Sequence, residues 1–346
     1  PWSGLQEDIE SAFLIDGVAS ICNRAFSECN RLRFVQIQKS VASFDENPFT
    51  GCWNLKVIDV SENPNFVFVD GVLMNKEMTQ IISCIPSKFG DYSIPNTVTS
   101  ICAGAFRVCR RLTSIVISDS VTSIGDEAFN SCRLRTITIP NSVVSIGSRA
   151  FQDCGLLASI EVPNSVKEIG DEAFAYCDGM KAITLPGSVE TLGTNLFIWC
   201  SKLSEITVAG EGGNIRMVDG VLFSGDMTRL IWCSRKKSGS YEIPNTVKAI
   251  DESAFNNCKK LTSVAIPDSI TKIDDCAFLD CSGLEAVTIP NSVTSIGSFA
   301  FSSCTSLKSV VIPDSVTFIG KYAFNTCTKM TEFFIPSSVF SLGFNP

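Results

Sequence analysis

Cysteine is the residue type in this chain that could do the most chemistry, and most of the cysteines recur at a fixed spacing. The chain has 346 residues, with 16 cysteines and no histidine. Because histidine is absent, Ser-His-Asp and Cys-His nucleophiles and histidine-containing metal sites are excluded. Eleven cysteines share one phase, 22 or 23 residues apart except across gaps of 57 and 58 residues: Cys29, Cys52, Cys109, Cys132, Cys154, Cys177, Cys200, Cys258, Cys281, Cys304 and Cys327.

These cysteines could bind a metal or one another. A cysteine zinc site needs pairs two to four residues apart, and Cys276 with Cys281 is an isolated close pair, so we predict no metal and no other cofactor. Stacked strands lie about 4.8 Å apart, which a disulfide would permit, but stacked thiols point in parallel and bury easily. We predict a structural ladder of free cysteines, and leave open a bond between Cys84 and Cys102 in an oxidising compartment.

Paired acids are the second group with catalytic potential. They stand at Asp126-Glu127, Asp171-Glu172 and Asp251-Glu252, each before a same-phase cysteine. They could act as an acid and a base, or they could cap the free N–H groups of a short helical turn, which is the interpretation that we favour. No glycine-rich phosphate-binding motif occurs, so nucleotide binding is not indicated.

The elements that must position these residues form a repeat, visible in the stretch from Ile289 to Pro313. In its last part, Leu307-x-x-Val310-x-Ile312 predicts a strand that stacks in a parallel ladder. A turn, a second short edge, a flexible corner at Gly320 and a short helical turn up to Cys327 follow. A period in this range with apolar residues in phase indicates a solenoid, because a single coil cannot bury its apolar face alone.

The string Ile-Pro-Asn-Ser-Val-Thr-Ser-Ile-Gly-x-x-Ala-Phe-x-x-Cys-x-x-Leu-x-x-Val-x-Ile resembles the 23-residue repeat of BspA-like (Treponema-type) leucine-rich-repeat surface proteins. The resemblance implies a curved solenoid on the surface of bacteria and some protists, associated with adhesion. By position it assigns structural roles only, to Phe301, Cys304, Leu307, Val310, Ile312 and their equivalents. The predicted fold class is a leucine-rich-repeat solenoid: a β-rich right-handed coil with a parallel strand ladder, short helical turns and two inserted β-hairpins.

We expect a single solenoid domain over residues 1–346. Residues 1–28 are predicted to form an irregular first coil, and residues 61–92 and 209–241 are predicted to be insertions that contain the hairpins. The last repeat stops before its cysteine. We therefore expect a truncated final repeat in a fragment of a longer protein.

Two groups of side chains are candidates for a binding surface. The first is the position between the last two inward residues of each strand, which forms a threonine-rich row, and the second is the set of tryptophans near the insertions. Threonine is also an ordinary filler of exposed strands, and the tryptophans could simply cover a widened coil, so both structural explanations stay open. The candidates are Thr138, Glu161, Thr184, Thr207, Thr288, Trp199 and Trp232.

The net charge and the hydropathy of the chain limit the classes of partner that it is expected to bind. A net charge of −8 and a pI near 4.8 argue against nucleic acid and anionic membranes. No apolar run reaches the roughly 18 residues of a membrane span, so we expect no direct membrane insertion. We predict an extracellular or cell-surface module, not an enzyme, that adheres to a protein or glycan of a host or neighbouring cell. The rival hypothesis is a structural protein that self-associates through its solenoid ends into fibres or surface layers.

Overall fold

The computed structural model describes residues 6–210 and 213–343 and shows the predicted solenoid of parallel strand ladders. Most coils contribute one strand to a front ladder and one short strand to a second ladder. The chain divides into two compact units, Pro1–Met180 with Val189–Gly193, and Lys181–Ser188 with Thr194–Pro346. The solenoid class is therefore confirmed, whereas the single domain over residues 1–346 stays a prediction.

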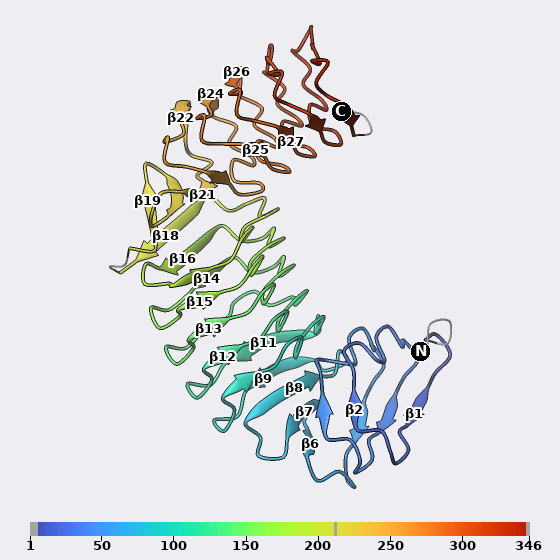
Figure 1. The fold of residues 1–346 in the computed structure, drawn as a ribbon. Helices are drawn as coiled ribbons and strands as arrows, with labels where there is room; N and C mark the ends of the chain where they lie inside the picture. The colour runs from blue at the N-terminus through green and yellow to red at the C-terminus, as the bar shows by residue number, and fades with distance from the viewer. Residues whose placement is uncertain (1–5, 211–212, 344–346) are drawn as a thin grey trace. The chain divides into compact units, whose positions relative to one another are not determined.

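The first unit contains the N-terminal coils (Figure 1). Its front strands are β1 (Ser11–Phe13), β3 (Phe34–Gln36), β5 (Val57–Asp59), β9 (Gly90–Ser93), β11 (Leu112–Val116) and β14 (Ser159–Glu161). The second ladder contains β2 (Ser20–Ile21), β4 (Ser43–Phe44), β8 (Gln80–Cys84), β10 (Ser100–Ile101), β12 (Ser123–Ile124), β13 (Ser145–Ile146), β15 (Glu168–Ile169) and β17 (Thr191–Leu192). Partners in register stand one repeat apart, as Val35 does from Ile58, so equivalent apolar residues stack.

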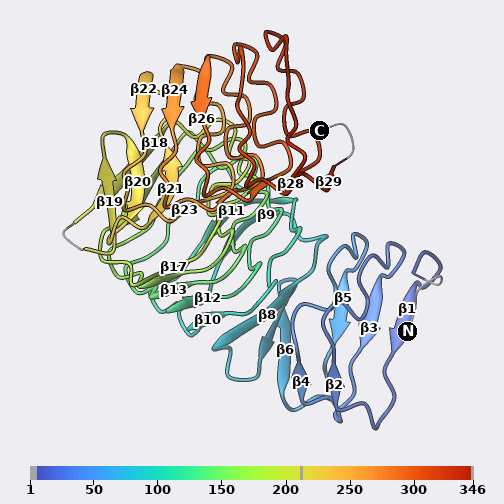
Figure 2. The same ribbon diagram turned by 45° about the horizontal axis from the view of Figure 1, so that its top comes forward.

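The second unit repeats this plan, and Figure 2 shows β22, β24 and β26 side by side. Its front strands are β16 (Ala182–Pro186), β18 (Glu205–Ala209), β22 (Gly239–Glu242), β24 (Leu261–Ala265) and β26 (Ala286–Thr288). Its second ladder contains β23 (Ala249–Ile250), β25 (Lys272–Ile273), β27 (Ser295–Ile296), β28 (Phe318–Ile319) and β29 (Ser341–Leu342).

Both predicted hairpins are present, and each gains a third strand. β6 (Phe66–Val69), β7 (Val72–Asn75) and β8 run antiparallel, as do β19 (Ile215–Val218), β20 (Val221–Ser224) and β21 (Arg229–Cys233). Asp70 and Gly71 turn the chain between β6 and β7, with φ angles of 49° and 76°. Two successive positive φ angles are typical of a type I′ turn, for which Asp-Gly between apolar strands is the signal. Each insertion is therefore a three-stranded meander.

The predicted short helical turns are wrong: the segments before the ladder cysteines are successive β-turns. Between residues 102 and 109, alternate N–H groups donate to the carbonyl three residues back, as Ala105 does to Cys102 at 3.1 Å. The N–H groups between them donate to the following coil, as Phe106 does to Ala128 at 2.7 Å. An α-helix needs all of these donors within its own chain segment, and positive φ angles at Gly104 and Val108 also interrupt it.

The repeated glycine corner depends on close stacking rather than on flexibility, which corrects the interpretation made from the sequence. Gly147 has no positive φ. A Cβ atom on it would lie 2.5 Å from the backbone nitrogen of Asp126 and 2.6 Å from the carbonyl carbon of Gly125. Adjacent coils therefore approach each other so closely here that a side chain does not fit.

The core is a column of identical residues inside the coils. Phe106, Phe129 and Phe151 are fully buried, and their rings stack with centroids 5.3 Å apart. In the second unit Phe255, Phe278 and Phe301 form the same stack. Each buried phenylalanine contributes roughly 1.5–3 kcal/mol, but only where a neighbouring coil covers it. This dependence explains why the repeat must stack.

Candidate binding surface

The predicted row of exposed strand residues exists as a surface in the first unit. Val116 pairs with Thr138 in parallel register, while the apolar neighbours Ile115 and Ile137 are buried. The side chain of Val116 is 60% exposed, and Thr138 and Glu161 are also exposed. An open groove of about 490 Å³ lies beside Val116 and Thr138. The front of these coils is therefore lined by short side chains and carries few charges.

In the second unit the same position forms shorter rows. Thr184 pairs with Thr207, and Ala265 pairs with Thr288. Thr207 and Thr288 are exposed, whereas Thr184 is half-buried. We refer to the exposed residues Val116, Thr138 and Glu161 of the first unit as the strip.

The two candidate tryptophans do not join the strip. Trp199 is 37% exposed but lies in a turn segment, at a φ of 56°. Trp232 was expected on a binding surface, but its side chain is only 5% exposed, and it lies in β21 opposite Leu222 of β20. Trp232 is therefore part of the core of the widened coil and is not carried into the proposal below.

The ladder cysteines use their thiols as internal hydrogen-bond donors. Cys132 Sγ donates to Phe106 O at 3.1 Å, and Cys154 Sγ donates to Phe129 O at 3.2 Å. The same bond to the phenylalanine of the previous coil recurs at Cys52, Cys177, Cys281, Cys304 and Cys327. Burial raises the pKa of the Cys154 thiol well above its usual value. All 16 cysteines are free thiols in this structure, and their redox state in solution stays a prediction.

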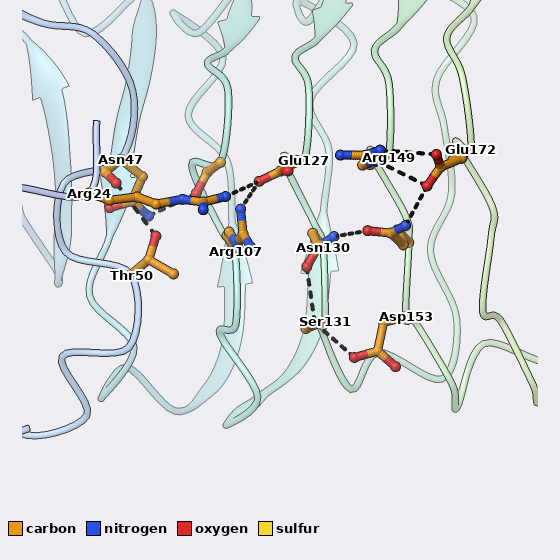
Figure 3. A network of polar contacts seen from close by, with 12 residues as sticks. Arg24, Asn47, Thr50, Arg107, Glu127, Asn130, Ser131, Arg149, Asp153 and Glu172 are labelled. Carbon is orange, nitrogen blue, oxygen red and sulfur yellow. Dashed lines mark hydrogen bonds and ion pairs between the residues drawn. The ribbon is translucent and has the colours of Figure 1, made fainter. Parts of the chain in front are cut away.

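The paired acids do not cap helices, because no helix follows them. Asp126 Oδ1 accepts a hydrogen bond from the backbone N–H of Ser148 in the next coil at 2.7 Å. Glu127 pairs with Arg107 and, at 3.5 Å, with Arg24, which stands 103 residues earlier (Figure 3). Asp126 and Glu127 thus connect neighbouring coils.

Asn47 lies at the junction of the same polar network and was missed from the sequence (Figure 3). Its side chain is buried; Nδ2 donates to Gly104 O at 2.8 Å. Its Oδ1 accepts from Phe49 N–H at 3.0 Å and from Ser83 Oγ at 2.7 Å. One amide therefore ties a coil before the first insertion to residues within and after it.

Each meander is held by a lysine that was also missed. Lys88 Nζ lies 2.8 Å from Asp70 Oδ2 and 4.8 Å from the ring centroid of Tyr92, and its side chain is 8% exposed. The second meander repeats the set with Lys237, Asp219 and Tyr241. The tip of each meander is thereby fixed to the strand that re-enters the ladder, through an ion pair and a cation–π contact. The duplication of the insertion was the signal that could have revealed it.

The described residues contain neither a cluster of metal-ligating side chains nor a candidate membrane helix. Over residues 6–210 and 213–343, no three His, Cys, Asp or Glu side chains gather as metal ligands would. The same residues include no helix of the length and hydropathy that a membrane span requires. What remains is a solenoid whose front strands present an exposed row: the architecture of a leucine-rich-repeat interaction module.

Comparison with known proteins gives the family. The profile described as a BspA type leucine rich repeat region matches residues 5–82, 83–208 and 232–345. The chain belongs to this family, as the repeat string indicated. No curated protein sequence matches the chain.

Solved structures of similar fold are bacterial leucine-rich-repeat proteins. A leucine rich cell surface protein from Faecalibacterium prausnitzii is 28% identical, with a TM-score of 0.60, over 98% of this chain and 88% of that chain. The pneumococcal vaccine antigen PcpA is 25% identical, with a TM-score of 0.59, over 81% of this chain and 82% of that chain. Neither description adds a catalytic role.

Proposed function

We propose that the chain is a non-catalytic, cell-surface or secreted adhesion module that binds a protein or glycan through the strip. The observation that carries the proposal is the pairing of Val116 with Thr138: both are exposed beside an open groove, while the residues next to them are buried. Exposed positions of this kind contribute little to the core. The strip is therefore free to vary for recognition. Membership of a surface-protein family supports the location.

The test is an array of extracellular-matrix proteins and glycans probed with the purified chain. Thr138→Lys places a long cation beside the groove and should reduce capture of any bound ligand at least about tenfold, the loss expected when a contact is blocked by charge and bulk. Thr122→Lys is the matched control, because Thr122 is also exposed but precedes the second ladder. Equal capture by both variants would remove the strip as the binding surface.

End-to-end assembly stays the alternative hypothesis. Phe334 and Phe340 are 74% and 83% exposed on the last coils that the structure describes, and exposed apolar edges favour association. Sedimentation of the unmodified chain over a concentration series separates the hypotheses. An adhesion module stays monomeric, whereas an assembling protein grows with concentration and responds to Phe334→Lys but not to Thr138→Lys.

A further inference from the structure

The front sheet that contains β16 ends at β18, and among the described residues no other strand pairs with the outer edge of β18. Glu205 N–H donates to Lys181 O, and Ala209 O accepts from Gly187 N–H. The odd-numbered residues of β18 therefore bond to β16. In a parallel strand the alternate residues bond to the opposite side, so the N–H and C=O groups of the two residues between them face outward.

These outward residues are Ile206 and Val208. Where another front strand follows, the residue equivalent to Val208 uses its N–H: Ile243 donates to Ala265 O at 3.1 Å. After β18 the chain leaves the ladder for the meander. Within residues 6–210 and 213–343, the main-chain groups of Ile206 and Val208 therefore have no hydrogen-bond partner on that side.

An open groove of about 590 Å³ borders this edge, between β18 and β19, which Figure 1 shows next to each other. Arg216 of β19 is exposed and lines the groove. The nearby cations Lys236 and Lys237 pair with Glu205 and Asp219. Among the residues that the structure describes, Arg216 has no carboxylate partner. Among the described residues, the groove thus combines main-chain groups that lack a hydrogen-bond partner with a positive charge that lacks a carboxylate partner.

We propose that this edge binds an extended, acidic peptide segment of a partner protein by β-strand addition. The outward groups of Ile206 and Val208 are two residues apart, about 7 Å, which matches alternate residues of an added strand. Main-chain hydrogen bonds would supply the affinity, and a carboxylate beside Arg216 would supply the selectivity. The inference rests on the proposed function in one respect, that the ligand is a polypeptide, and it places a second site apart from the strip of the first unit.

The probe is a peptide labelled with fluorescein at its N-terminus, fluorescein-Thr-Val-Asp-Val-Thr-amide, measured by fluorescence polarisation with the whole chain. Val208→Pro removes the outward N–H but none of the bonds to β16, and proline is tolerated at such edge positions. Thr207 is already extended, as a residue before proline must be. We expect Val208→Pro to weaken binding about tenfold, the factor for one hydrogen bond. Val208→Ala, which keeps the N–H, should stay within about twofold.

Three further arms keep the outcome independent of how well Val208→Pro folds. A peptide with N-methylated alternate amides should lose binding to the unmodified chain. Arg216→Ala should weaken binding of the acidic peptide about tenfold. The same substitution should leave unchanged the binding of a second peptide in which Asn replaces the Asp. Thr138→Lys should not change the binding of either peptide. The proposals for the strip and for the β18 edge can therefore be refuted independently.

Some results would overturn the proposal. Failure of the unmodified chain to bind the peptide at millimolar concentration would reject β18 as an acceptor edge. Binding that survives both Val208→Pro and N-methylation would show that main-chain pairing is not involved. A concentration-dependent dimer that Val208→Pro dissociates would show that a second copy, not a partner peptide, occupies the edge.

Discussion

Asn47→Ala should open the junction that this amide makes inside the first unit. The substitution removes the bond to Gly104 O at 2.8 Å and the bonds from Phe49 N–H and Ser83 Oγ at 3.0 and 2.7 Å. The site is almost fully buried, so water cannot readily replace them. At roughly 1 kcal/mol for each net bond, the local free energy of opening should fall by about 3 kcal/mol.

Amide hydrogen exchange measures the free energy of opening at individual amides. A local measurement is required because a long repeat array does not necessarily unfold in one step. Phe26 and Glu28 donate to Pro48 O and Thr50 O at 3.0 and 2.9 Å, in the coil that Asn47 anchors. A loss of about 3 kcal/mol corresponds to roughly a 100-fold loss of protection at these amides.

Ser83→Ala is the matched control for Asn47→Ala. It removes one of the three bonds and leaves the Asn47 amide paired with Gly104 and Phe49. Protection should therefore fall only about fivefold, for a cost near 1 kcal/mol. If Asn47→Ala changes exchange no more than Ser83→Ala does, the amide is not what holds the junction and the reasoning is wrong.

Two further predictions concern the stacked coils. Gly147→Ala should destabilise the chain by roughly 3 kcal/mol in urea denaturation, because the added Cβ would meet the backbone of Asp126. Gly155→Ala is the control: its added Cβ would meet nothing within 4 Å, so the free energy of unfolding should change by under about 0.5 kcal/mol. Equal costs for the two variants would contradict the stacking argument. Burial raises the pKa of Cys154, so above about pH 9 the unfolded chain releases this proton while the folded chain keeps it, and the free energy of unfolding falls with rising pH. Cys154→Ala should make that fall shallower by up to about 1.4 kcal/mol per pH unit, and an unchanged slope would show that this thiol does not titrate on unfolding.

The repeat predicted the ladders well because its period directly sets their register. Val35 pairs with Ile58 and Ile273 with Ile296, in each case 23 residues on. The 22-residue interval before Cys154 is absorbed as well, since Ile124 still pairs with Ile146. The apolar residues that recur at the same positions of each repeat identify the buried side chains. Their burial fixes the register, because a slip of one residue would turn these side chains outward.

The prediction of short helical turns is wrong because it relied on the local helix preference of each segment, whereas hydrogen bonds to the neighbouring coil determine the conformation of that segment. A segment such as Asp126-Glu127-Ala128-Phe129 has acids in first-turn positions and no glycine or proline, which favours a helix on its own. In the structure Glu127 N–H donates to Ser148 O and Phe129 N–H donates to Ala150 O, both at 2.8 Å. A neighbouring coil offers acceptors at every second residue, and the segment takes the conformation that uses them.

The candidate peptide site shows why functional surfaces are harder to predict than ladders. Ile206-Thr207-Val208 and Val264-Ala265-Ile266 have the same alternation of apolar and exposed residues. Ile266 N–H donates to Thr288 O at 3.4 Å because another coil follows, whereas after Val208 a meander follows. An open edge is therefore a property of what comes after a strand, not of the strand itself. A repeat protein can gain such a site by inserting a segment between two coils, without changing any residue of the strand that will bind.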